Sequence, residues 1–140
     1  MRVAGIMSGT SLDGIDVAIV DLADGKINTV AFHTTPYSPA VRAAILAVSN
    51  CTTHTAAIAR THFLLGRLYA QAVRETCRRH RVRMESIDLI GCHGQTIYHQ
   101  GDAANFLGQP VSATLRTRSP RTRLPIFPGG GCSGTPCSRT

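Results

Sequence analysis

A short polar segment near the start of the chain has residue types that could bind phosphate. It covers residues 8–14 and reads SGTSLDG. Its two glycines allow backbone N–H groups to turn inward around anionic oxygens, and Thr10 and Ser11 add hydroxyl donors without adding negative charge. The segment therefore predicts a phosphate-binding hairpin loop. A plain polar turn with Asp-Gly at its tip accounts for the same residues, and this alternative stays open.

Two carboxylates accompany this loop. Asp13 and Asp16 would repel a bare phosphate, but a Mg²⁺ ion placed between carboxylate and phosphate removes the repulsion, because this hard cation prefers oxygen ligands and keeps several waters. We therefore predict that Asp13 and Asp16 lie near Mg²⁺. The chain contains neither G-x-x-x-x-G-K-[ST] nor G-x-G-x-x-G. It thus predicts neither a P-loop nor a Rossmann dinucleotide site.

A second polar segment, CHGQT at residues 92–96, follows an apolar stretch. Open sheets bind ligands at the carboxyl ends of their strands, which favours a binding role here. His93, Gln95 and Thr96 offer directional donors and acceptors suited to a hydroxyl-rich substrate, so we predict them at a substrate cleft. A histidine with its hydrogen bonds satisfied inside a polar turn is the alternative.

Cysteine and histidine spacing favours no metal centre. Cys92, His93 and His99 have a spacing that is typical of no familiar site, and Cys132 and Cys137 have no second pair of ligands nearby. Cys92 and His93 are also a poor nucleophile pair, since neighbouring residues on a strand point to opposite faces.

The elements that position these segments follow from apolar periodicity and turn residues. The predicted strands cover residues 2–7, 15–21, 27–34 and 86–92, and the predicted helices cover residues 40–48 and 53–81. Tight turns join the first three strands, which predicts an antiparallel meander. Ser38 is expected to cap the first helix. The second helix carries one apolar stripe made of Ile58, Leu65, Leu68 and Ala72.

Residues 5–16 (GIMSGTSLDGID) and residues 90–96 (IGCHGQT) together resemble the two N-terminal signatures of the anhydro-N-acetylmuramic acid kinases. The resemblance covers roughly residues 1–110. It implies an α/β fold, namely the N-terminal lobe of an actin-like or ribonuclease H-like ATPase, in truncated form. The residues that it assigns to ATP phosphates are Gly9, Thr10, Ser11, Leu12, Asp13, Gly14, Ile15 and Asp16. It also implies that His93, Gln95 and Thr96 lie near the sugar-binding cleft.

The reaction implied by this resemblance depends on ATP. Water opens a 1,6-anhydro ring while the γ-phosphoryl group moves to the freed O6, which gives N-acetylmuramic acid 6-phosphate in cell-wall recycling. The resemblance thus implies ATP and Mg²⁺ as cofactors, a small amino-sugar substrate and a homodimer. The amino terminus lacks the pattern of a secretory signal and the chain has no long uncharged apolar run, so we expect a cytoplasmic protein without a membrane partner.

The charge is concentrated at the end of the chain. The 140 residues carry a formal net charge of +7, but residues 1–110 hold ten basic against eight acidic residues, whereas residues 111–140 hold five arginines and no acid. We therefore predict a kinase subdomain at residues 1–110 and a disordered Arg/Pro/Gly-rich tail at residues 111–140, which we interpret as a frame-shifted or miscalled ending. Nucleic-acid binding is disfavoured, because aromatic residues make up only 5% of the chain and no known motif is present.

The chain also departs from the pattern of the family it resembles. Members carry a later Asp-Phe-Arg segment, whose aspartate activates water, and a Gly-Gly-Gln-Gly-Ala-Pro-Leu stretch, and neither is present here. No Asp or Glu follows Asp102, so the tail offers no general base. We therefore expect no turnover by this chain alone. The alternative function is a non-catalytic nucleotide- or sugar-binding module of the same superfold.

Overall fold

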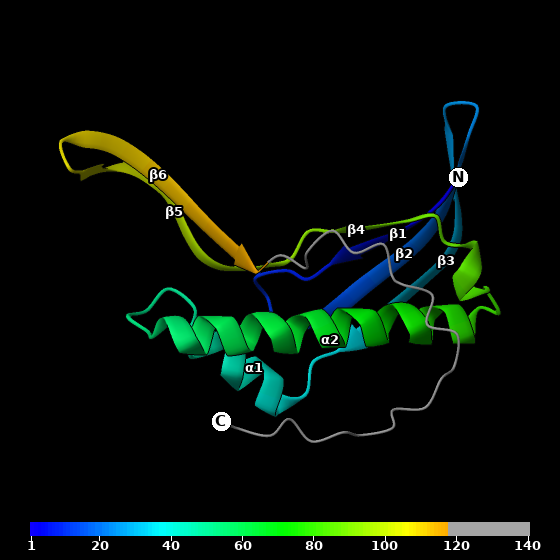
Figure 1. The fold of residues 1–140 in the computed structure, drawn as a ribbon, viewed down its shortest axis with the longest axis horizontal. Helices are drawn as coiled ribbons and strands as arrows, with labels where there is room; N and C mark the ends of the chain where they lie inside the picture. Colours follow the sequence, from blue (N-terminus) through cyan, green and yellow to red (C-terminus); the bar gives the residue numbers. More distant parts are fainter. Residues whose placement is uncertain (118–140) are drawn as a thin grey trace, which may run out of the picture.

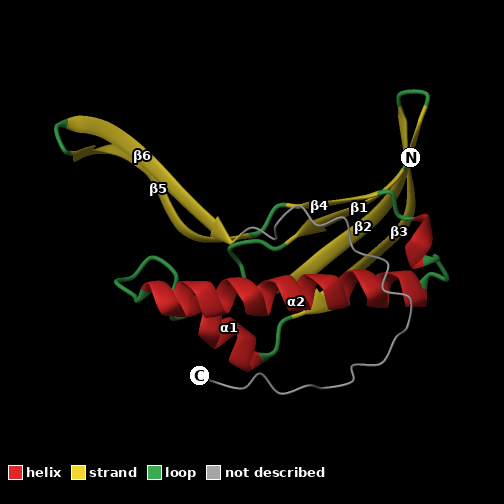
Figure 2. Ribbon diagram, viewed as in Figure 1, coloured by secondary structure: helices red, strands yellow, loops and turns green. Residues whose placement is uncertain are grey.

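The computed structural model describes residues 1–117, which form a mixed α/β arrangement of a sheet, two helices and a separate hairpin (Figures 1 and 2). The elements in chain order are β1 (Arg2–Met7), β2 (Gly14–Ala23), β3 (Lys26–Pro36), α1 (Pro39–Leu46), α2 (Thr55–Arg79), a 3₁₀ turn (Met84–Ser86), β4 (Leu89–Cys92), β5 (Gln95–Phe106) and β6 (Gln109–Thr117).

The main sheet has the strand order β3-β2-β1-β4. β1 pairs antiparallel with β2, and β2 pairs antiparallel with β3, which confirms the predicted meander. Asp24 and Gly25 join β2 to β3 with φ values of 52° and 71°. These positive values are typical of the two-residue hairpin turn that an Asp-Gly pair favours. β4 pairs in parallel with β1. Such a parallel pairing needs a long connection, which α1 and α2 provide because they lie between β3 and β4 in the sequence.

α2 packs across one face of this sheet (Figure 2). Alternate strand residues such as Ala4, Val17 and Ile19 are fully buried beneath it, as the two-residue period of a strand requires. Leu65 and Ala72 of the predicted stripe are buried, and Ile58 and Leu68 pack partly buried against the same core. No helix in the described part of the chain is long and apolar enough to cross a membrane.

α1 begins with the predicted cap. Ser38 Oγ accepts a hydrogen bond from the backbone N–H of Val41 at 3.3 Å, and Pro39 occupies the first turn. A proline is well tolerated there because the first N–H groups of a helix have no partner inside the helix. α1 is nevertheless two residues shorter at its end than the predicted range, which extended to residue 48.

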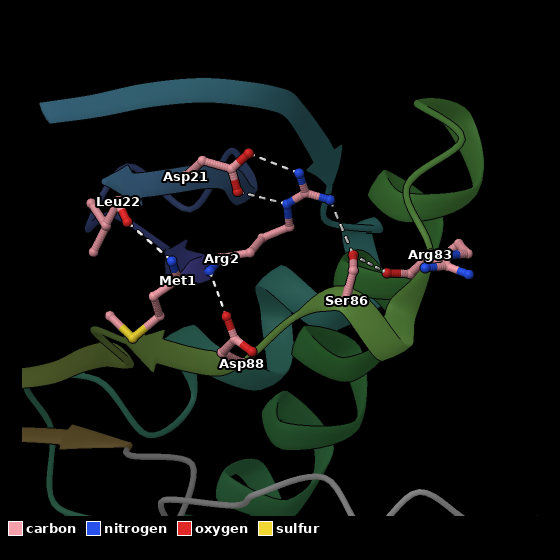
Figure 3. Close-up of polar contacts among 7 residues, drawn as sticks. All are labelled: Met1, Arg2, Asp21, Leu22, Arg83, Ser86 and Asp88. Atoms are coloured by element: carbon pink, nitrogen blue, oxygen red, sulfur yellow. Dashed lines mark hydrogen bonds and ion pairs between the residues drawn. The ribbon is translucent and has the colours of Figure 1, made fainter. Parts of the chain in front are cut away.

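Arg2 joins the start of β1 to two other elements (Figure 3). Its guanidinium donates to both carboxylate oxygens of Asp21 at 2.7 and 2.8 Å and to Ser86 Oγ at 3.2 Å. Its backbone N–H donates to Asp88 Oδ2 at 2.7 Å. The hydrogen bonds from Arg2 lower the pKa of the Asp21 carboxyl. These contacts fix the segment that leads into β4 beside β1, so they help to set the parallel register of the two strands.

The β5–β6 hairpin was not predicted. It leaves the body of the molecule (Figure 1), and most of its residues are exposed. At its base, Ile97 is buried and its carbonyl accepts a hydrogen bond from the Asn50 N–H at 2.8 Å. The prediction of a disordered tail from residue 111 is wrong for residues 111–117, because they form most of β6 and pair with β5. The rest of that predicted tail, including Cys132 and Cys137, lies outside the described residues.

The end of α2 supports a first testable prediction. Glu75 accepts hydrogen bonds from Arg78 at 2.8 and 3.0 Å and from Arg79 at 2.6 Å, which lower the pKa of its carboxyl to about 2 from an ordinary 4.5. Because the folded pKa is the lower one, the stabilisation is complete above the ordinary pKa and is lost as the pH falls from 4.5 toward 2. An NMR titration of the Glu75 carboxyl should find this low midpoint.

The matched variants for that titration are Arg78→Ala with Arg79→Ala, and Arg67→Ala as a control two turns away. The double variant should move the Glu75 midpoint back toward 4.5, whereas Arg67→Ala should leave it near 2. A midpoint near 4.5 in the unmodified chain would show that the two arginines do not hold the carboxylate.

Candidate functional site

The two polar segments meet at one edge of the sheet. Because β1 and β4 are parallel, with Ile6 opposite Cys92, their carboxyl ends lie side by side. The β1–β2 loop (residues 8–13) follows β1, and His93 and Gly94 follow β4. The His93 N–H donates to the Ile6 carbonyl at 3.0 Å, which extends this pairing past the end of β4. The structure thus places two segments that are about eighty residues apart in the sequence next to each other.

The β1–β2 loop is closed by a tight turn. The Leu12 N–H donates to the Gly9 carbonyl at 3.2 Å, and Leu12 has a φ of 58°, in the left-handed region. Its side chain is only 5% exposed and belongs to the core. Thr10, Ser11 and Asp13 are exposed. The buried Leu12 side chain therefore anchors the loop. The hydroxyl and carboxylate groups of the loop face solvent, where a phosphate ester could reach them.

Gly14 lies against the backbone of the neighbouring strand. A Cβ atom at this position would lie 2.4 Å from the Thr35 carbonyl oxygen and 2.9 Å from Pro36 Cα. The Asp13 carbonyl also accepts a hydrogen bond from the Tyr37 N–H at 3.1 Å. Only glycine fits this close approach, so the second glycine of the motif positions the loop against β3 rather than simply permitting a turn.

The two aspartates differ in their surroundings. Asp13 is exposed, whereas Asp16 is half-buried on β2 opposite Met7, and its Oδ1 accepts a hydrogen bond from Thr34 Oγ1 at 2.6 Å. Within residues 1–117, no group of three or more His, Cys, Asp or Glu side chains is placed to hold a metal ion. Carboxylate oxygens are nevertheless the kind of ligand that Mg²⁺ prefers, and this ion usually completes its six positions with water and phosphate oxygens.

A buried polar cluster lies beneath the loop. The hydroxyls of Ser8 and Tyr69 are 2.9 Å apart, and Ser8 Oγ donates to the Gly94 carbonyl at 3.4 Å. Burial raises the pKa of the Tyr69 hydroxyl above its ordinary value. This contact was not predicted from the sequence, although Tyr69 follows Leu65 by four residues on the helix and therefore occupies its core-facing side. The cluster connects the end of β1 to α2 and to the residue after His93.

The three predicted substrate residues occupy different environments. The His93 side chain is exposed, and its Nδ1 lies 3.0 Å from the Gly94 carbonyl oxygen. The Gln95 side chain is fully buried, and its Nε2 donates to the Gly9 carbonyl at 3.1 Å. Thr96 is half-buried on the opposite face of β5 from Gln95, because successive strand residues alternate. The structure therefore brings the Gln95 side chain to the β1–β2 loop, whereas His93 is held next to the end of β1 through its backbone N–H.

Comparison with known sequences places this α/β chain among kinases. It belongs to the anhydro-N-acetylmuramic acid kinase family, whose model matches residues 1–118. Proteins named anhydro-N-acetylmuramic acid kinase from Bacillus cereus strains AH187 and G9842 are 40% identical over 127 residues and 42% identical over 125 residues, respectively. One from Bacillus anthracis strain CDC 684 is 39% identical over 127 residues.

Each of these three matches covers 86% of this chain but only 32% of the relative. The chain thus spans about a third of the length of the curated relatives that it matches. The family match continues to residue 118 and so includes the residues of β6. Residues 111–117 are thus both part of a β-strand and similar to the family.

Proposed function

We propose that this chain supplies the phosphate-binding part of a kinase that acts on 1,6-anhydro-N-acetylmuramic acid. ATP and Mg²⁺ are the proposed cofactors, and N-acetylmuramic acid 6-phosphate, formed with hydrolytic opening of the anhydro ring, is the proposed product. The observation that supports this most is the β1–β2 loop, which exposes Thr10, Ser11 and Asp13 at the shared edge of β1 and β4 in a chain of this family. The lobe is proposed to be actin-like, and the protein a cytoplasmic homodimer.

The loop's part in the reaction follows from its donors. The hydroxyls and backbone N–H groups of Thr10 and Ser11 would donate to phosphate oxygens, and the loop is anchored by the buried Leu12 side chain. Asp13 and Asp16 would hold Mg²⁺, which when bound neutralises charge on the phosphates. Catalysis of phosphoryl transfer is mainly such positioning and charge stabilisation. His93 and Thr96 are proposed to face the sugar.

The general base is the missing part of this proposal. In the family that the chain resembles, the aspartate of an Asp-Phe-Arg segment activates water, and these 140 residues do not include that segment. The second candidate function is a non-catalytic nucleotide- or sugar-binding module with the same fold. The two candidates differ in one measurable property, namely phosphoryl transfer when the remaining part of a family member is supplied.

A hybrid protein tests this function. Residues 1–117 of this chain would be joined to the part of the Bacillus cereus AH187 relative that follows the matched segment, with the unmodified relative as positive control. We expect the hybrid to transfer phosphate from ATP to 1,6-anhydro-N-acetylmuramic acid, and the 140-residue chain alone to transfer none. A folded hybrid that binds Mg·ATP or the anhydro sugar without transfer would favour the binding module. One that binds neither Mg·ATP nor the anhydro sugar would contradict both functions.

A further inference from the structure

We propose that Gln95 is a positioning residue, which aims the backbone N–H of Thr10 outward at the phosphate by holding the Gly9 carbonyl inward. This inference rests on the proposed function of the β1–β2 loop. It also gives Gln95 a role different from the substrate contact expected from the sequence. Its side chain is buried and donates a hydrogen bond to the Gly9 carbonyl of the loop.

The Gly9 carbonyl is held by two donors. Gln95 Nε2 donates to it at 3.1 Å, and the Leu12 N–H donates to it at 3.2 Å. The same Nε2 also donates to the Thr96 carbonyl at 3.2 Å, so the carboxamide bridges β5 and the β1–β2 loop. Gln95 is fully buried and Leu12 is nearly so. The carbonyl therefore points toward the interior.

The geometry of the peptide bond converts this inward carbonyl into an outward donor. In a planar trans peptide, the carbonyl of one residue and the N–H of the next point in opposite directions. No peptide bond within residues 1–117 is cis. With the Gly9 carbonyl directed inward, the Thr10 N–H is directed to the side where Thr10 and Ser11 are exposed. Outward backbone N–H groups next to hydroxyls are the donors that an anion-binding loop needs.

Gln95 is itself held firmly in place. Its backbone N–H donates to Thr117 Oγ1 at 3.1 Å, and Ser8 donates to the preceding Gly94 carbonyl at 3.4 Å. Its Oε1 atom is buried without a hydrogen-bond partner among residues 1–117. An unpaired buried carbonyl costs stability, which an apolar side chain of similar size would avoid. A carboxamide at this position is therefore better explained by what its N–H₂ group does to the loop than by packing.

The test uses the 140-residue chain without ligand. Gln95→Met keeps the volume but removes the donor, Gln95→Glu replaces the donor with an acceptor, and Gln100→Met is a control on the same strand. Amide hydrogen exchange of Leu12, followed by NMR, should become at least about tenfold faster in both Gln95 variants and stay unchanged in the control. Exchange of the α2 core amides should not change, which separates positioning from general loss of stability.

Two results would overturn the inference. One is Leu12 exchange in a folded Gln95→Met variant at the rate of the unmodified chain, and the other is an equal acceleration of the loop and α2 amides. If the variants do not fold, the unmodified chain still decides. Its Gln95 side-chain amide protons should exchange at least about tenfold more slowly than those of the exposed Gln71, and equal rates would overturn the inference.

Mg·ATP titration separates this inference from the proposed function. We expect Gln95→Met to weaken Mg·ATP binding by about tenfold while Gln100→Met leaves it unchanged. Faster loop exchange without any Mg·ATP binding by the unmodified chain would support the contact between Gln95 and the loop but contradict the phosphate role. If the Leu12 amide of Gln95→Met exchanged as slowly as in the unmodified chain and Mg·ATP binding were normal, the result would support the proposed function and contradict the role of Gln95.

Discussion

Replacing Gly14 with alanine should lower the free energy of unfolding by about 3 kcal/mol or more. The new Cβ would lie 2.4 Å from the Thr35 carbonyl oxygen and 2.9 Å from Pro36 Cα, and both neighbours are backbone atoms that cannot rotate away. Gly14 is also paired in register with Pro36. The end of β2 must therefore move away from β3, which also disturbs the bond between Asp13 and Tyr37. Urea unfolding followed by circular dichroism measures the change.

Gly66→Ala is the matched control for this substitution. Gly66 lies inside α2, and a Cβ there would meet nothing within 4 Å. Alanine favours a helix over glycine by about 1 kcal/mol, so this variant should be more stable than the unmodified chain. Opposite signs for the two variants are the expected result. A Gly14→Ala variant as stable as the unmodified chain would show that the close approach of β2 and β3 is wrong.

Replacing Asp13 with asparagine in the hybrid kinase should lower kcat/KM by at least about 100-fold. Asparagine has nearly the same shape but no negative charge, so it weakens the proposed Mg²⁺ contact without crowding the loop. Because the Asp13 side chain is exposed, the melting temperature should change little. Steady-state kinetics with 1,6-anhydro-N-acetylmuramic acid and varied Mg²⁺ measure the loss.

Asp24→Asn serves as the control for that experiment. Asp24 occupies the turn after β2, at the other end of the strand from the β1–β2 loop. It should leave kcat/KM unchanged, and added Mg²⁺ should not affect the variant differently from the unmodified hybrid. If Asp13→Asn retained most of the activity at low Mg²⁺, the carboxylate would have no part in binding the metal.

Local patterns predicted much of the fold. The meander followed from short apolar stretches divided by Asp-Gly and similar turns, and Ser38 capped α1 as its position before Pro39 suggested. The apolar stripe of α2 also identified Leu65 and Ala72 as core residues. These features depend on residues that are close to one another in the sequence, so the local sequence is sufficient to predict them.

The β5–β6 hairpin could not be predicted in the same way. Most of its residues are exposed on both faces, so the apolar alternation that indicates a half-buried strand is absent. The contact between Gln95 and Gly9 was not predicted, for a different reason. Its partner Gly9 is 86 residues away, and only the parallel pairing of β1 with β4 brings the two together. The sequence indicated which residues are polar but not which of them would be buried.

The most direct test of the central claim is an NMR titration of the 140-residue chain with Mg·ATP. The β1–β2 loop should respond first, with shifts in the amide signals of residues 9–13 that saturate on the order of 1 mM, whereas adenosine with Mg²⁺ should leave these signals in place. Shifts confined to other residues, such as the arginine-rich end of α2, with the loop signals unmoved, would contradict the account.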